Sequence, residues 1–155
     1  MIRWAANILL ISAAVWAIRR FLGFLAAGRQ PLATDALLAG GQFVDIDGVR
    51  LHYENSGAGP PAVLVHGLLG SSGVWSALTP LLADIATTYA LDLPGSGLSD
   101  KPGDRTYEPS EHAKTLIKFV ETVIGRSVRL VTTSAGAQVA LAAMARRPDL
   151  FNGLA

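Results

Sequence analysis

A single serine between a β-branched run and a helical pattern is the residue best suited to chemistry in this sequence. Segment 128–132 (Val-Arg-Leu-Val-Thr) predicts a buried strand, and segment 138–147 has helical periodicity. Ser134 lies between them in segment 132–136 (Thr-Thr-Ser-Ala-Gly), which carries threonine where the pattern G-x-S-x-G has its first glycine. Small neighbours are needed where a strand turns sharply into a helix, because the serine there has a strained backbone. The segment therefore predicts a serine placed as a nucleophile.

Two glycine-containing loops precede this serine, and each follows a short apolar strand. Segment 66–72 (His-Gly-Leu-Leu-Gly-Ser-Ser) comes directly after the apolar run 62–65, and Asp92 opens segment 92–99 (Asp-Leu-Pro-Gly-Ser-Gly-Leu-Ser). The glycines at 67, 70 and 73 do not have the G-x-G-x-x-G spacing of a dinucleotide site, which argues against Asp92 as a ribose ligand.

These three motifs, in this order and at this spacing, resemble the serine-nucleophile, esterase-like branch of the α/β-hydrolase superfamily, from about residue 42 to the C-terminus. The resemblance implies that Ser134 is the catalytic nucleophile. It implies that the backbone N–H groups of Leu68 and Ala135 form an oxyanion hole, which stabilises charge on the attacked carbonyl oxygen. Loop-shaping rather than catalytic roles follow for His66, Gly67 and Gly136. No cofactor is implied.

The resemblance also places a catalytic Asp or Glu after the sixth or seventh strand and a histidine base after the last strand. Segment 152–155 has the pattern expected at the start of the sixth strand, so we expect the acid and the base to be missing here. The other histidines, His52 in an early strand and His112 in the first turn of a helix, are expected to be surface or edge residues. A serine without a base stays protonated at neutral pH, so this chain alone is expected to be inactive.

Three functions follow from these observations. The first is a serine hydrolase truncated before its acid and base, and the second is a non-catalytic interaction module. The third is half of a split enzyme, completed by another chain that supplies the C-terminal strands. Because haloalkane dehalogenases and epoxide hydrolases carry aspartate at this position, Ser134 indicates acyl transfer on a small ester, thioester or related carbonyl substrate.

Composition excludes several other functions. The net charge of +1 over 155 residues offers no basic stripe for phosphates, so nucleic acid is not expected as a partner. The sequence has no cysteine, which excludes disulfides and thiolate metal sites. No cluster of histidine or acidic residues has the spacing of a metal site.

The N-terminal 27 residues have the composition of a membrane segment. Segment 4–18 is almost wholly apolar, arginines flank it, and no acidic residue precedes Asp35. We expect a single-pass anchor over residues 1–27, with a cleaved signal peptide of a secreted or periplasmic protein as the alternative. A linker over residues 28–41 and a partial α/β-hydrolase domain over residues 42–155 follow.

The remaining pattern predicts an α/β fold. Segments 43–46 and 49–53 flank Asp47-Gly48, which is typical of a two-residue β-hairpin turn. Apolar or β-branched runs at 62–65, 88–91 and 127–132 alternate with helical patterns, and a helix is expected from Pro109 to about residue 124. The expected domain is the N-terminal part of the α/β-hydrolase fold, a mostly parallel sheet with helices on both faces, preceded by a membrane helix.

Overall fold

The computed structural model describes residues 41–155, and the first element of this part is the predicted hairpin. Strands β1 (Gly41–Ile46) and β2 (Val49–Ser56) pair antiparallel, with Ile46 opposite Val49. The two turn residues, Asp47 and Gly48, have φ of 53° and 75°. Positive φ at both positions is what a type I′ turn requires, and this geometry explains why Asp-Gly closes the hairpin.

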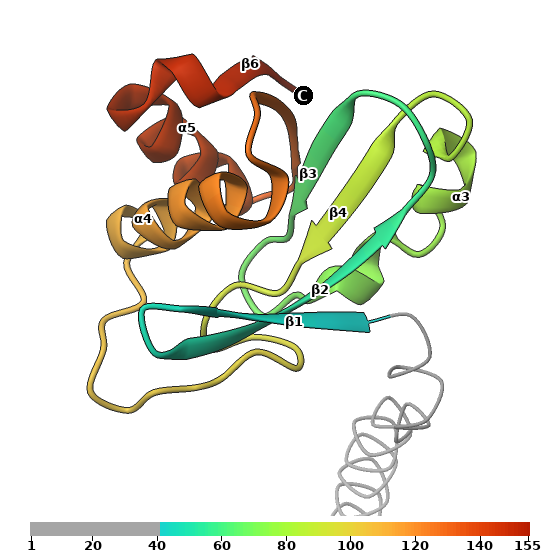
Figure 1. Cartoon of the computed structure of the whole chain (residues 1–155). Helices are drawn as coiled ribbons and strands as arrows, with labels where there is room; N and C mark the ends of the chain where they lie inside the picture. The colour runs from blue at the N-terminus through green and yellow to red at the C-terminus, as the bar shows by residue number, and fades with distance from the viewer. Residues whose placement is uncertain (1–40) are drawn as a thin grey trace, which may run out of the picture. The chain divides into compact units, whose positions relative to one another are not determined.

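The sheet has six strands in the order β1-β2-β4-β3-β5-β6 (Figure 1). Strand β2 is antiparallel to β4, whereas β4, β3, β5 and β6 run parallel. The strands not yet named are β3 (Pro61–Val65), β4 (Thr87–Leu91), β5 (Val128–Thr132) and β6 (Phe151–Leu154). The predicted parallel strands are confirmed to within one residue. Since β3 lies between β4 and β5, the loops that follow these three strands leave the same edge of the sheet.

Two helices pack together on one face of the sheet (Figure 1). They are α4 (Pro109–Phe119), whose last turn widens into the π-helical η2 (Val120–Ile124), and α5 (Gly136–Arg146). Pro109 stands at the start of α4, where its missing N–H costs no hydrogen bond, and Gly125 ends η2 in the left-handed conformation. The helix expected from Pro109 to residue 124 is thus confirmed. A 3₁₀ turn, η3 (Pro148–Leu150), leads into β6.

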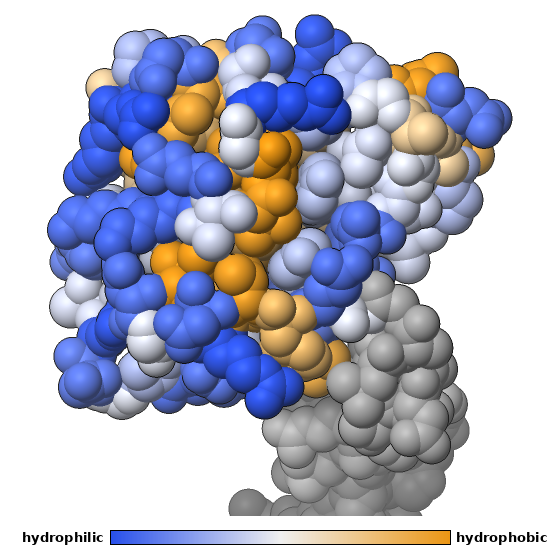
Figure 2. All heavy atoms as spheres, in the orientation of Figure 1, coloured by the Kyte–Doolittle hydropathy of each residue, from blue (hydrophilic) through white to orange (hydrophobic). Residues whose placement is uncertain are grey.

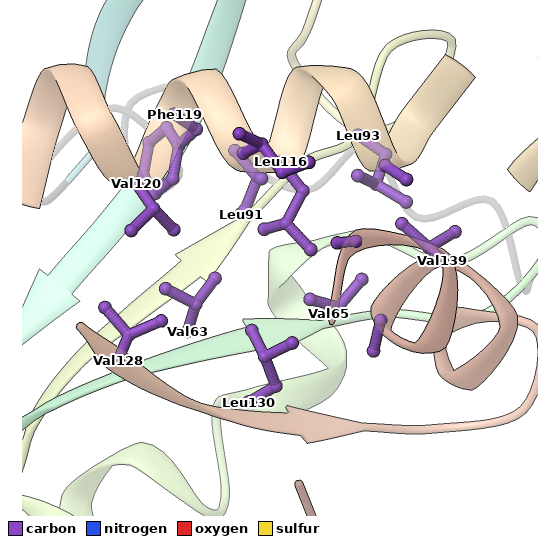
Figure 3. Close-up of a cluster of buried hydrophobic side chains, with 14 of the residues drawn as sticks. Val63, Val65, Leu91, Leu93, Leu116, Phe119, Val120, Val128, Leu130 and Val139 are labelled. Carbon is purple, nitrogen blue, oxygen red and sulfur yellow. The ribbon is translucent and has the colours of Figure 1, made fainter. Parts of the chain in front are cut away.

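The main core lies between these helices and the sheet. Side chains alternate along β3, so that Val63 and Val65 face the helices and Leu64 faces the opposite side. Figure 3 shows the helical side chains Leu116 and Phe119 directed at the strand residues. In the space-filling view a hydrophobic band lies between the helices and the strands, with hydrophilic side chains on both sides (Figure 2).

Over residues 41–155, the helical elements on the opposite face are short. They are the 3₁₀ turn η1 (Ser72–Trp75) and the four-residue α3 (Thr79–Leu82). Pro80 has no N–H to donate, which prevents a continuous helix through this segment. Trp75 is 8% exposed and packs on Leu64 and Ala90 in the smaller core on this face.

The predicted membrane anchor (residues 1–27) lies outside the described residues, as does the linker (28–41) except for its last residue. Within residues 41–155, no helix combines the length and the apolar character needed to cross a bilayer.

Candidate active site

Ser134 occupies the corner between β5 and α5 with a left-handed backbone. Its φ is 52°, and only Asp47 and Leu69 share positive φ among the described residues other than glycine. Such a conformation costs about 1–3 kcal/mol and persists only where the surroundings impose it. The strained serine expected from the sequence is present, and its side chain is exposed.

The surroundings that impose this conformation come from the end of β3. A Cβ atom at Gly136 would lie 2.5 Å from the carbonyl oxygen of Val65 and 2.7 Å from that of His66. The N–H of Thr133 donates to the Val65 carbonyl at 3.3 Å. The serine corner and the first residues after β3 are therefore packed backbone against backbone, which only small residues permit.

Two backbone N–H groups near this corner have no hydrogen-bond partner within residues 41–155. Neither the N–H of Leu68 nor that of Ala135 donates a hydrogen bond to another described residue. Ala135 precedes the first residue of α5, so its N–H lies at the positive end of an eleven-residue helix. In the other loop, the Gly70 N–H donates to the Gly67 carbonyl at 3.1 Å, which closes a turn around Leu68. Both residues, Leu68 and Ala135, line the cavity described below.

His66 is held by hydrogen bonds at both ring nitrogens. Its Nε2 accepts from the Leu93 N–H at 3.1 Å, and its Nδ1 lies 2.8 Å from the Gly67 carbonyl oxygen. These partners assign the proton to Nδ1, because a carbonyl can only accept. The ring is 2% exposed, and neither nitrogen is free to act as a base.

Asp92 is a buried acceptor rather than a ligand residue. It accepts from the Leu98 N–H at 2.9 Å, from the Ser72 N–H, and from Nδ1 of His52 at 2.8 Å. The expectation that His52 is a surface or edge residue is wrong, since its side chain is fully buried. Residues 92–100 pack against β2, where Asp100 and Ser99 accept from the backbone N–H groups of Arg50 and His52. The spacing of these residues in the sequence gives no sign of this contact.

A cavity of about 370 Å³ lies beside the serine corner. His112, which was expected at the surface, is half-buried in its wall, and burial lowers the pKa of this imidazole, with a smaller contribution from His66. Among the described residues, no Asp, Glu, Lys or Arg lines the cavity. The lining residues are His66, Gly67, Leu68, Leu69, Leu93, Ser96, Tyr107, Pro109, His112, Ala135, Gly136, Gln138 and Val139.

None of the three histidines of the sequence forms a hydrogen bond with Ser134. Over residues 41–155, no three His, Asp or Glu side chains are grouped so that they could hold a metal ion. The geometry places a strained serine beside two N–H groups that have no hydrogen-bond partner among residues 41–155, next to a cavity whose described lining carries no carboxylate, lysine or arginine.

Comparison with known proteins agrees with this geometry. The sequence model of the family described as "alpha/beta hydrolase fold" matches residues 60–155. Over 111 residues the chain is 36% identical to a 2-(acetamidomethylene)succinate hydrolase of Mesorhizobium japonicum, a match that covers 72% of this chain and 40% of the relative. A haloalkane dehalogenase of Bradyrhizobium diazoefficiens is 36% identical over 110 residues, covering 70% of this chain and 35% of that protein.

Solved structures give the same result. The crystal structure of an E-2-(acetamidomethylene)succinate hydrolase superposes with a TM-score of 0.70 at 34% identity, covering 74% of this chain and 42% of that one. The chain thus spans about 40% of the length of the relatives it matches.

Proposed function

Because the chain belongs to the α/β hydrolase fold family, we propose that Ser134 is the nucleophile of a serine hydrolase acting on ester-like or related carbonyl substrates. The observation that carries the proposal is the left-handed backbone of Ser134 beside two unpartnered N–H groups. A strained serine at a strand-to-helix corner exposes its hydroxyl while the first N–H groups of the helix remain free.

The reaction follows from these groups. The Ser134 Oγ attacks the substrate carbonyl carbon while its proton passes to a base, and the carbonyl electron pair moves onto oxygen. The N–H groups of Leu68 and Ala135 donate to that oxyanion, and each such donor is worth a factor of about 10²–10³ in rate. Collapse of the intermediate breaks the bond to the leaving group and leaves an acyl-serine, which water hydrolyses.

The cavity supports an uncharged carbonyl substrate. Its wall carries apolar side chains together with the polar groups of Ser96, His112 and Gln138. The described lining has no carboxylate, lysine or arginine, and the lowered pKa of His112 favours a neutral imidazole there. A haloalkane dehalogenase is among the relatives, but that class has aspartate where this chain has Ser134, which favours acyl transfer over dehalogenation.

We also propose that residues 1–155 by themselves do not turn substrate over. Both nitrogens of His66 are occupied, His52 is buried against Asp92, and no histidine is hydrogen-bonded to the serine. Hydrolysis of p-nitrophenyl acetate by the chain should therefore equal that of Ser134→Ala. A faster reaction by the unsubstituted chain would show that a base is present.

A cysteine variant tests the nucleophile without needing that base. The sequence contains no cysteine, so Ser134→Cys carries a single thiol. A thiol ionises far more readily than a hydroxyl, and a helix N-terminus lowers its pKa further. We expect p-nitrophenyl acetate to release about one p-nitrophenolate per chain as the thiolate attacks the ester and a thioester forms.

Ser76→Cys is the matched control, because Ser76 is exposed and its side chain forms no hydrogen bond with a described residue. Acylation of Ser134→Cys should be faster than that of Ser76→Cys by at least about tenfold. This threshold is set below the factor of about 10²–10³ that one oxyanion donor contributes to the rate. Equal rates for the two thiols would refute the assignment of Ser134.

We further propose that residues 1–27 anchor the protein in a membrane. The support is the apolar run 4–18, the flanking arginines and the absence of acidic residues before Asp35. The chain should enter the detergent phase on fractionation, and deletion of residues 1–27 should release it. A chain that retains its N-terminus and stays in the aqueous phase would contradict the anchor.

A further inference from the structure

A fully buried histidine outside the proposed catalytic groups joins β2 to the end of β4. His52 Nδ1 lies 2.8 Å from Asp92 Oδ2, and the two side chains are 0% and 1% exposed. The backbones meet at the same point, since the Asp92 N–H donates to the His52 carbonyl at 2.9 Å. The Ser99 hydroxyl accepts from the His52 N–H at 2.9 Å and donates to the Asp92 carbonyl at 2.6 Å.

The Asp92 carboxylate is the centre of this arrangement. Its Oδ2 accepts from both His52 and the Leu98 N–H, and its Oδ1 accepts from the Ser72 N–H. A Cβ atom at Gly97 would lie 2.0 Å from Oδ2, so the backbone of this loop approaches the carboxylate as closely as only glycine allows. The carboxylate therefore fixes two loops at once.

One of these loops carries the Leu68 N–H. Segment 66–72 is tied at its two ends to consecutive residues, because His66 Nε2 accepts from the Leu93 N–H while the Ser72 N–H donates to Asp92. Between the two ties, the backbone hydrogen bond within the segment is the one from Gly70 to Gly67. The position of Leu68 thus depends on both ties.

We infer that His52 is a positioning residue, which acts through Asp92 to hold the Ser72 end of the loop that presents the Leu68 N–H. His52 Nε2 has no hydrogen-bond partner among the described residues, so Nδ1 alone makes the polar contribution of the ring. Without that donor, the carboxylate keeps only the N–H groups of Leu98 and Ser72, which hold its orientation less firmly than three donors do. The effect on chemistry rests on the proposed function, whereas the effect on the loop does not.

Amide hydrogen exchange of the 155-residue chain, measured residue by residue by NMR, tests the inference. The variants are His52→Leu, which removes the donor, and His52→Asn, whose amide can donate from nearly the position of Nδ1. Leu51→Ala is the control, because Leu51 is buried on the same strand and faces the main core. In His52→Leu the Ser72 and Leu98 amides should exchange about tenfold faster, the effect of losing one hydrogen bond.

The Leu93 amide, bound to His66, should keep its rate in His52→Leu, and His52→Asn should restore Ser72 and Leu98 to within about threefold of the original chain. Leu51→Ala should accelerate core amides without selecting these two. Selective acceleration by Leu51→Ala, or unchanged Ser72 and Leu98 rates in His52→Leu, would overturn the inference. If His52→Leu does not fold, Asp92→Asn, which keeps the shape but turns an N–H₂ toward a donor, must give the same selective acceleration.

Acylation of the Ser134→Cys variant provides the second measurement. Adding His52→Leu should slow acylation by about tenfold or more, since the loss of one oxyanion donor costs about 10²–10³, and His52→Asn should recover most of the rate. A Ser134→Cys variant that reacts no faster than Ser76→Cys would refute the proposed function. The exchange rates would still decide the role of His52.

Discussion

Gly67 and Ser134 lie in direct contact across the gap between the end of β3 and the serine corner. A Cβ atom at Gly67 would be 2.9 Å from the Ser134 Cβ and 3.4 Å from its Oγ. The loop that follows β3 and the serine corner therefore approach each other closely at Gly67, which has no side chain.

Gly67→Ala should therefore impair chemistry more than folding. The added methyl group must displace Ser134 by a few tenths of an ångström, and catalytic geometry is sensitive to such shifts. In the Ser134→Cys background we expect acylation by p-nitrophenyl acetate to slow by about tenfold or more. The control is Gly103→Ala, since a Cβ at Gly103 meets no atom within 4 Å. Equal acylation rates for the two double variants would contradict this prediction.

Gly136→Ala should impair folding itself. Its methyl group would meet the main-chain carbonyls of Val65 and His66 at 2.5 and 2.7 Å, and neither carbonyl can move without shifting β3. We expect the free energy of unfolding to fall by about 2–3 kcal/mol, the cost of overpacking a close contact. Urea denaturation measures it, with Gly103→Ala expected within about 0.5 kcal/mol of the original chain. A Gly136→Ala variant as stable as Gly103→Ala would show that the corner can expand.

The sequence predicted the hairpin, the parallel strands and the serine corner, because each of them depends on residues that are close together in the chain. Asp47-Gly48 predicted the hairpin because positive φ at both turn residues suits these residue types, and β-branched runs predicted the parallel strands. The small residues around Ser134 predicted its strained corner, although Thr132 replaces the first glycine of the pattern. Each of these signals lies within a few residues of the element that it describes.

The burial of His52 could not be predicted in this way. Its partner Asp92 is forty positions away, and Ser99, which also contacts it, is farther still. A histidine beside the core residue Leu51 on an alternating strand points to the face that strand patterning marks as exposed. Segment 92–100, which is distant in sequence, packs against the histidine together with Phe43 of β1 and makes it an interior position. The wall position of His112 has the same cause, because loops distant in sequence form the cavity.

Leu116→Ala should destabilise the domain through the main core. Leu116 is fully buried between α4 and the sheet, and truncation of such a leucine typically costs about 2–5 kcal/mol (Figure 3). Leu141→Ala is the matched control, because Leu141 lies on α5 and is 59% exposed, and it should change stability by less than about 0.5 kcal/mol. Thermal and urea unfolding of both variants measures these changes. Equal losses of unfolding free energy in the two variants would contradict the placement of Leu116 in the main core.

His112 should make stability depend on pH in a defined direction. Burial lowers the pKa of His112 from its ordinary value of 6.5, with His66 adding to the shift, so the folded state favours the neutral imidazole. Above pH 6.5 the imidazole is neutral in both states and this preference costs nothing. As the pH falls through 6.5 toward the lower folded-state pKa, the unfolded chain binds the proton first, and stability is lost.

We therefore expect the difference in unfolding free energy between the original chain and His112→Gln to shift against the original chain as the pH falls from 8 to 5. Other titrating groups contribute nearly equally to both proteins and cancel in this difference. Urea unfolding of the two proteins at several pH values measures it, and a difference that stays constant or moves in favour of the original chain would contradict the placement of His112 in the wall of the cavity.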